Sequence, residues 1–170
     1  MRNFFSPASI GTKPFAPRTP FWIFVGVSIL GFSDAAYLAA KYLQGIAPPC
    51  TVLSGCETVT LSAYAEIAGI PVSLLGALYY AGLFLLSLIA WETKKRVFFF
   101  LATRATIIGF LMSLYFVFLQ LVVLRAFCAY CMFSAVTSTT LFVIGLLVYV
   151  QDEREREWWG SRFFNRFWRR

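Results

Sequence analysis

Four long apolar runs constrain this chain more than any other feature. Each holds about 20 or more mostly apolar residues, the length that a helix needs to cross a hydrocarbon layer of roughly 30 Å. The whole chain is 59% hydrophobic with a mean hydropathy of +0.72, well above a soluble domain, and the runs are too uniformly apolar for helices with one wet face. The sequence therefore predicts an all-α integral membrane protein, a single four-helix bundle. The runs are Phe21 to Leu43, Val72 to Trp91, Val97 to Leu124 and Cys128 to Val150.

Basic residues are distributed unevenly among the segments that flank these runs. Lysine and arginine beside membrane spans are retained on the cytoplasmic side. They are abundant before the first run, between the second and third, and after the last, whereas only Lys41 and Arg125 lie near the other two connections. We predict a multi-pass protein of the inner (cytoplasmic) membrane, with both termini in the cytoplasm and the first and third connections outside. The net charge of +7 needs no nucleic-acid partner.

The two ends of the chain differ in character from the runs between them. Residues 1–20 contain four prolines, and each proline removes a backbone donor and restricts the residue before it. We predict a flexible cytoplasmic tail there and a membrane domain over residues 21–150. Residues 151–170 combine arginines with tryptophans and phenylalanines, a composition typical of an amphipathic helix on the inner membrane surface.

The two predicted outer connections differ in length. The first, Gln44 to Pro71, is longer than a helix connection needs, and such loops are usually functional. We predict that it carries a short helix at the membrane interface over Ser62 to Ala68, ended by the turn that begins at Gly69. The second is only Arg125 to Phe127, which holds Cys128 near the bilayer surface.

The four cysteines of the chain form two pairs, both on the predicted outer face. Cys128 and Cys131 form a CxxC motif at the start of the last run, where residues three apart share a helix face. Helix N-terminal amides stabilise a thiolate at the first cysteine, and CxxC pairs often cycle between dithiol and disulfide. Cys50 and Cys56 lie in the long loop beside proline and glycine, whose bends permit a disulfide.

The residues alone leave three interpretations of this quartet open. The loop pair is a structural staple in an oxidising compartment, or the two pairs exchange disulfides as a relay, or the four sulfurs bind zinc. A relay is favoured because both pairs lie on one face and exchange needs only contact between one thiolate and the other disulfide. Zinc is disfavoured because the spacing from Cys50 to Cys56 is wide for a zinc knuckle, so no metal site is predicted.

Asp34 is the only acidic residue inside a predicted span. An ionisable group in a membrane helix is costly and is by default a functional candidate. Asp34, Tyr37 and Lys41 are spaced to form one polar stripe toward the outer face, which suggests a path that supplies protons. The alternative is that Lys41 extends to the interface while hydrogen bonds within the bundle hold Asp34.

The order and spacing of these residues resemble the vitamin K epoxide reductase family, especially its bacterial homologues. The resemblance covers roughly Asp34 to Thr140. The DsbB type of disulfide-generating protein is similar in size but carries its CxxC in the first outer loop, whereas here the wide pair comes first. The matching residues are Cys50, Cys56, Ser62, Tyr64-Ala65, Gly69-Ile70-Pro71-Val72-Ser73-Leu74-Leu75-Gly76 and Cys128-Ala129-Tyr130-Cys131.

The resemblance implies an enzyme, a quinone-dependent thiol oxidoreductase that supports disulfide bond formation. By that match, Cys50 exchanges with a thioredoxin-like (DsbA-like) partner, Cys56 passes electrons to Cys128, and Cys131 faces a quinone, ubiquinone or menaquinone, within the bundle. No flavin or metal is required. Ser62 matches the family's hydroxyl residue and is expected to donate a hydrogen bond to a quinone carbonyl; the alternative is that Ser62 caps a local helix.

Two departures from the family pattern shape these expectations. Many bacterial relatives carry a fused thioredoxin-like domain, and no such domain follows Val150 here, so we expect a separate partner protein. Nothing in the residues indicates whether vitamin K epoxide is a substrate, and quinone reduction is the expectation. The rival interpretation is a non-enzymatic membrane protein with structural disulfides.

Overall fold

The computed structural model describes residues 18–49 and 55–167, and within them four helices are long and apolar enough to cross a membrane. The predicted four-helix membrane bundle is therefore confirmed. The spans are Thr19–Leu43, Val72–Thr93, Val97–Leu124 and Ala129–Val150. They belong to α1 (Arg18–Leu43), α3 (Val72–Thr93), α4 (Arg96–Phe118) with its π-helical continuation η2 (Leu119–Leu124), and α5 (Ala129–Phe167).

The first and last helices differ from their predicted bounds. α1 begins at Arg18 rather than Phe21, because Pro20 lies in the first turn, where a missing N–H costs no intrahelical bond. α5 begins at Ala129, so Cys128 lies just before the span. The predicted terminal helix over residues 151–170 is not a separate element, since α5 continues to Phe167 without a break. The tail predicted for residues 1–20 lies almost wholly outside the described residues.

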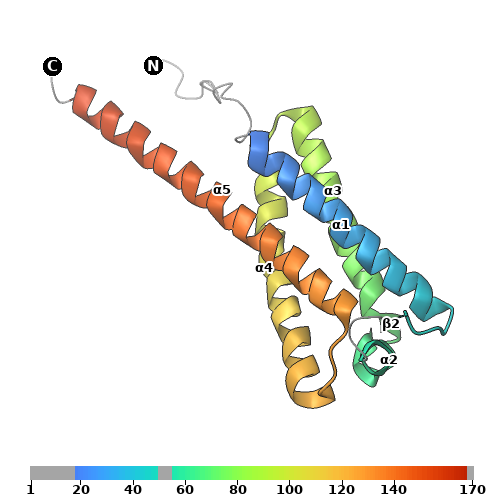
Figure 1. Ribbon diagram of the computed structural model, residues 1–170. Coiled ribbons are helices and arrows are strands. Elements are labelled where there is room, and N and C mark those ends of the chain that lie inside the picture. The colour runs from blue at the N-terminus through green and yellow to red at the C-terminus, as the bar shows by residue number, and fades with distance from the viewer. Residues whose placement is uncertain (1–17, 50–54, 168–170) are drawn as a thin grey trace.

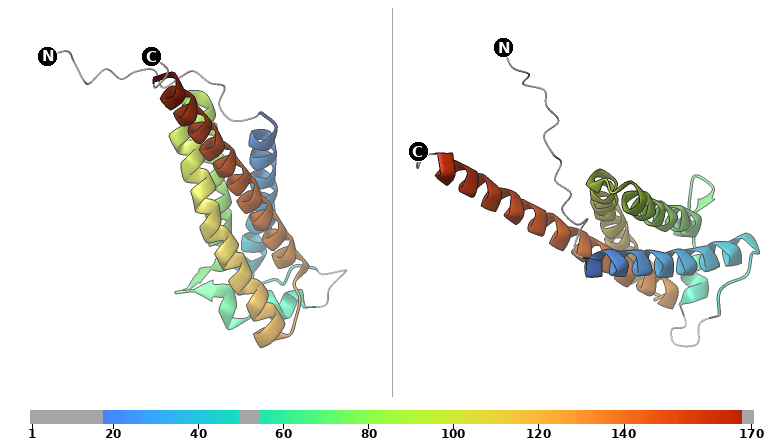
Figure 2. Two further views of the ribbon diagram at one scale, coloured as in Figure 1. Left: turned by 90° about the vertical axis from the view of Figure 1, so that its left-hand side faces the viewer. Right: turned by 90° about the horizontal axis from the view of Figure 1, so that it is seen from above.

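The four long helices form a ring in the order α1, α3, α4, α5, and each packs on its two neighbours. Figure 1 shows that the connection from α1 to α3 and the connection from α4 to α5 lie at the same end of the bundle. At the opposite end, α5 projects well beyond the other helices, as Figure 1 and the right-hand view of Figure 2 show. The two cysteine-bearing connections are thus neighbours in space.

Two adjacent tyrosines of α3 join the ring together. The Tyr80 hydroxyl lies 3.0 Å from the carbonyl oxygen of Ser134 and 2.9 Å from Thr137 Oγ1, both on α5. Its ring fills the space that a side chain at Gly31 of α1 would need. Tyr79 points the other way, to the Ala105 carbonyl of α4, 3.4 Å away. Small residues let helices approach closely in a membrane, where apolar side chains have no preference for one another over lipid.

The loop between α1 and α3 folds differently from its prediction. Its helix is α2 (Cys56–Thr60), followed by one 3₁₀ turn, η1 (Ala63–Ala65). A two-stranded hairpin then pairs β1 (Glu66–Ile67) with β2 (Ile70–Pro71). The predicted helix over Ser62 to Ala68 is therefore wrong in position, although the loop does carry a short helix.

The turn of this hairpin explains why no helix forms there. Ala68 and Gly69 have φ values of +52° and +79°, the pair of left-handed conformations that a two-residue hairpin loop requires and an α-helix excludes. A hydrogen bond of 2.9 Å from the Tyr42 hydroxyl to Glu66 ties the hairpin to the end of α1. The hairpin therefore covers the end of the bundle at which the cysteines lie.

We predict that Tyr80→Phe lowers the free energy of unfolding by roughly 1–2 kcal/mol, because the hydroxyl that joins α3 to α5 is lost. Unfolding of the purified protein in mild detergent, followed by circular dichroism, measures the change. Tyr149→Phe is the matched control, since Tyr149 is 45% exposed. Equal destabilisation by both substitutions would contradict the assignment.

Candidate active site

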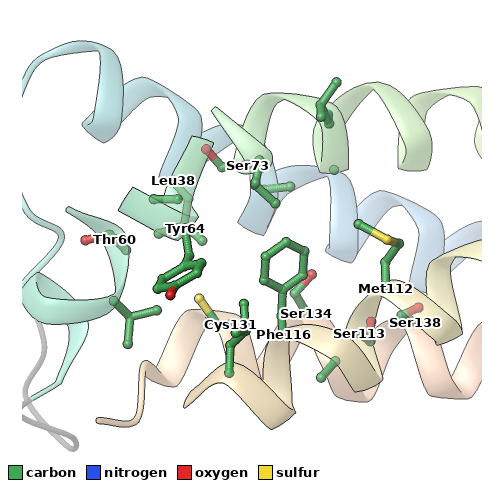
Figure 3. A pocket seen from close by; sticks show the side chains of 18 of the residues that line it. Leu38, Thr60, Tyr64, Ser73, Met112, Ser113, Phe116, Cys131, Ser134 and Ser138 are labelled. Atoms are coloured by element: carbon green, nitrogen blue, oxygen red, sulfur yellow. The ribbon is translucent and has the colours of Figure 1, made fainter. Parts of the chain in front are cut away.

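A cavity of about 330 Å³ lies inside the bundle, between the long helices and the folded loop. Most of its wall is apolar, and the Cys131 thiol lies on that wall. Figure 3 shows Cys131 and Ser134 from α5 on one side, with Tyr64 and Leu38 across from them. A cavity of this size with few polar groups is typical of a site for a small apolar ligand. The polar residues in its wall include Ser62, Ser73, Ser113, Gln120, Ser134 and Ser138.

The CxxC motif lies at the start of α5, with Cys128 just before the helix and Cys131 in its first turn. Cys128 is fully buried and Cys131 is partly buried, and both carry free thiols. The Cys131 thiol donates a hydrogen bond to Cys128 and lowers the pKa of Cys128 to about 7, against the opposing effect of burial. Backbone amides of Tyr130 and Cys131 act in the same direction, as the sequence predicted for a helix N-terminus. The pKa of the Cys128 thiol therefore lies below its ordinary value.

The long loop touches the CxxC segment at two points, each directly before one of its own cysteines. Just before Cys50, the carbonyl of Pro49 accepts a 3.3 Å hydrogen bond from the hydroxyl of Tyr130. Just before Cys56, Gly55 packs so tightly on Phe127 that an added Cβ would lie 2.6 Å from the Phe127 nitrogen. Cys56 directly follows Gly55, and Cys128 directly follows Phe127. The structure thus brings a cysteine of each pair to one place.

The redox forms of the described cysteines differ. Cys56 is buried and disulfide-bonded, whereas Cys128 and Cys131 are dithiol. The Cys50 prediction lies outside the described residues. Among residues 18–49 and 55–167, no three side chains of His, Cys, Asp or Glu gather as metal ligands.

Gln120 holds the connection between α4 and α5 in place. Its backbone carbonyl accepts from the amides of Arg125 and Ala126. Its side-chain Oε1 accepts a 2.9 Å hydrogen bond from the amide of Cys128. Arg125 has a φ of +48°, which ends the helix and reverses the chain. One glutamine therefore holds both the end of one helix and the residue that precedes the next, Cys128.

The structure places Ser62 in the wall of the cavity, but its hydroxyl is engaged. Ser62 Oγ donates a 2.8 Å hydrogen bond to the carbonyl of Val59. Ser62 is also the residue before η1, where its side chain makes no capping bond; its hydroxyl instead bonds a carbonyl in the last turn of α2, so a local structural role at a helix end stays open. The Ser62 oxygen keeps lone pairs that can accept a hydrogen bond.

Asp34 lies beside the CxxC rather than in the cavity wall. One of its carboxylate oxygens, Oδ2, is buried without a hydrogen-bond partner among the described residues. The Asp34 carboxylate interacts electrostatically with Cys128, Tyr130 and Cys131. The predicted polar stripe is partly formed, since Lys41 Nζ lies 5.8 Å from the centre of the Tyr37 ring. Hydrogen bonding within the bundle therefore does not account for the buried oxygen of Asp34.

Sequence reasoning missed three residues of this site. Gln120 stands alone as an amide within an apolar run, a signal that polar residues in membrane helices offer in general. Gly55 and Tyr130 are contacts between distant segments, and no local pattern reveals them. These three residues bring the loop and the CxxC together.

Comparison with known proteins finds one family. A model of the vitamin K epoxide reductase family matches residues 22–146, which include all four cysteines, Ser62, Gln120 and Asp34. Comparison with curated proteins finds no match.

We predict that Gly55→Ala slows disulfide exchange between Cys56 and Cys128 at least about tenfold, because the added methyl group separates the loop from Phe127. The rate is measured as disulfide formation under mild oxidant in a protein whose Cys50 and Cys131 are replaced by alanine. Gly82→Ala is the matched control, since a Cβ at Gly82 meets nothing within 4 Å. An unchanged rate in Gly55→Ala would show that the close packing does not control exchange.

Proposed function

Because the chain belongs to the vitamin K epoxide reductase family and is thereby a membrane thiol–disulfide oxidoreductase, we propose that it oxidises a thioredoxin-like partner and reduces a membrane quinone. The partner is a separate, DsbA-like protein outside the cytoplasmic membrane. The quinone is ubiquinone or menaquinone, bound in the apolar cavity. The reaction leaves a disulfide in the partner, so the activity supports disulfide bond formation.

The electrons follow the two cysteine pairs in sequence. A dithiol partner attacks the Cys50–Cys56 disulfide, leaves with a new disulfide, and passes two electrons and two protons to the loop pair. The Cys56 thiolate then attacks the sulfur of Cys128 in a Cys128–Cys131 disulfide, and Cys50 resolves the mixed disulfide. The CxxC dithiol finally gives two electrons and two protons to the quinone, which becomes a quinol as the Cys128–Cys131 disulfide reforms.

One observation carries this proposal: the CxxC lies between the loop and the cavity. Cys128 is approached from the loop side through Gly55 and Phe127, while Cys131 lines the cavity. A relay needs this separation, because the aqueous partner and the apolar quinone reach the protein from different phases. A disulfide-bonded Cys56 beside a dithiol CxxC corresponds to the form that would next reduce the quinone.

The orientation of the bundle supports an extracytoplasmic partner. Both cysteine-bearing connections lie at one end, and the lysine-containing turn from α3 to α4 lies at the other (Figure 1). Basic residues favour the cytoplasmic side. We therefore place Cys50 and Cys56 on the outer side, with residues 1–20 and 151–170 as cytoplasmic tails of a membrane domain over residues 21–150.

On the quinone side, we propose roles for Ser62 and Asp34. Ser62 lies in the cavity wall. If its hydroxyl hydrogen rotates away from the Val59 carbonyl, it donates a hydrogen bond to a quinone carbonyl. If the bond to Val59 is kept, the Ser62 oxygen accepts a hydrogen bond from the quinol hydroxyl. Asp34 has a buried oxygen free to accept a proton and interacts with both CxxC sulfurs. It is placed to receive protons from the thiols and to return them toward the quinone.

We predict that Cys56→Ala and Cys128→Ala each lower turnover more than about a hundredfold, because the relay has no parallel path. Purified protein is assayed for oxidation of a reduced thioredoxin-like protein and for quinone reduction by ultraviolet absorbance. Ser33→Ala is the control, since this exposed hydroxyl bonds only within its own helix, to the carbonyl of Ile29. Turnover retained in both cysteine variants would reject the relay and favour structural disulfides.

In Cys56→Ala, a mixed disulfide on Cys50 would identify the partner.

We predict different signatures for Asp34→Asn and Ser62→Ala. Asp34→Asn slows quinone reduction at least about tenfold and changes its pH dependence, because an internal proton acceptor is lost. Ser62→Ala raises the KM for quinone severalfold without changing the pH profile, because a hydroxyl that does not titrate is lost. Steady-state kinetics across a pH series measures both. An unchanged rate and pH profile in Asp34→Asn would exclude the proton path.

A further inference from the structure

The amide nitrogen of Gln120 is a buried donor without a partner. Gln120 is 2% exposed, and its Nε2 has no hydrogen-bond partner among the described residues. Two other buried polar atoms share this state, Asp34 Oδ2 and Ser138 Oγ. Leaving an amide donor unpaired in an apolar interior costs free energy comparable to a lost hydrogen bond. Such a group is expected to meet a ligand or to serve another purpose.

The orientation of this amide is fixed by its other contact. The backbone amide of Cys128 is a donor, so the atom of Gln120 that lies 2.9 Å from it must be the carbonyl oxygen Oε1. Exchange of the oxygen and nitrogen positions would set two donors against each other. The NH₂ group is therefore the free end, and it offers two hydrogens and no lone pair for accepting.

Gln120 belongs to the wall of the cavity in which the quinone is proposed to bind. Gln120 lines the same cavity as Cys131 and holds the amide of Cys128. It lies in the π-helical segment η2, and π-helical turns inside α-helices occur often at functional sites. The next three residues, Leu121, Val122 and Val123, are about half exposed on the outside of the bundle, so the segment turns its one amide inward.

From these contacts we propose that the Gln120 amide donates a hydrogen bond to a carbonyl oxygen of the bound quinone, next to the CxxC. The inference rests on the proposed quinone reduction. A quinone carbonyl is an acceptor without a hydrogen, which complements a donor without a lone pair. As electrons arrive, negative charge grows on that oxygen, and a preorganised donor stabilises it. Asp34 does not replace this contact, because it does not line the cavity.

The same residue then connects the two halves of the final electron transfer. Oε1 fixes the residue that receives electrons from the loop, and Nε2 fixes the molecule that takes them. The quinol oxygen carries its own hydrogen and is a weaker acceptor for the amide than the carbonyl oxygen of the quinone. Gln120 therefore binds the oxidised ligand more strongly than the product, which favours product release.

The carbonyl stretch of bound menadione tests this inference. In the wild-type protein, infrared spectra of menadione labelled with ¹³C at its carbonyls are expected to show a band below its position in detergent alone, as a hydrogen-bonded carbonyl does. In Gln120→Met, the band returns toward the unbound position, and the KM for menadione rises about tenfold for the loss of one hydrogen bond. The lowered band persists in Ser62→Ala, which removes the other proposed polar contact.

Two controls make the result specific to the amide. Gln44→Met makes the same chemical change at an exposed position outside the cavity and should leave both the band and the KM unchanged. If Gln120→Met does not fold, Gln120→Glu at alkaline pH keeps an oxygen for the Cys128 amide and offers no hydrogen to the quinone, so the band should also move. If wild-type protein shows no lowered band, or if the lowered band stays unchanged in a folded Gln120 variant, the inference is overturned. Wild-type protein that neither binds nor reduces menadione would instead refute the proposed function.

Discussion

The hydrogen bond from the Cys128 amide to Gln120 Oε1 determines how the reactive end of this bundle is built. It lies between the end of one span and the start of the next, where backbone groups have no helical partner. Because the bond is buried, breaking it would leave a donor and an acceptor unpaired in an apolar setting. The position of Cys128 relative to the cavity and to the loop follows from this one contact.

Around that contact, the loop and the bundle are assembled by close approach rather than by a large core. The spans expose much of their apolar surface, as expected of helices that face lipid. Specific packing comes instead from glycines that accept a neighbour, as Gly31 accepts Tyr80 and Gly55 accepts Phe127. In lipid, where the hydrophobic effect does not bring helices together, such fits and the hydrogen bonds beside them determine the arrangement.

Sequence reasoning succeeded where a physical requirement acts on a whole segment. The length and apolar character of the runs predict four spans, and the spacing of Cys128 and Cys131 predicts that their side chains meet at a helix start. It failed where distant contacts decide the backbone. The hairpin at Ala68 and Gly69 replaced a predicted helix because two left-handed residues reverse the chain there. The inward turn of Gln120 depends on a π-helical insertion, for which the sequence carries no recognised sign.

The bond between Tyr130 and Pro49 has a consequence for how the enzyme's redox properties can vary. The two residues between the cysteines of a CxxC motif commonly help to set its reduction potential. Here one of them also anchors the loop that we propose delivers electrons. A substitution at Tyr130 that shifted the reduction potential would therefore also weaken the attachment of the loop. The reduction potential of the CxxC and the position of the loop thus depend on one side chain. Adjustment of the potential alone is left to groups outside the motif, such as Asp34 beside the sulfurs.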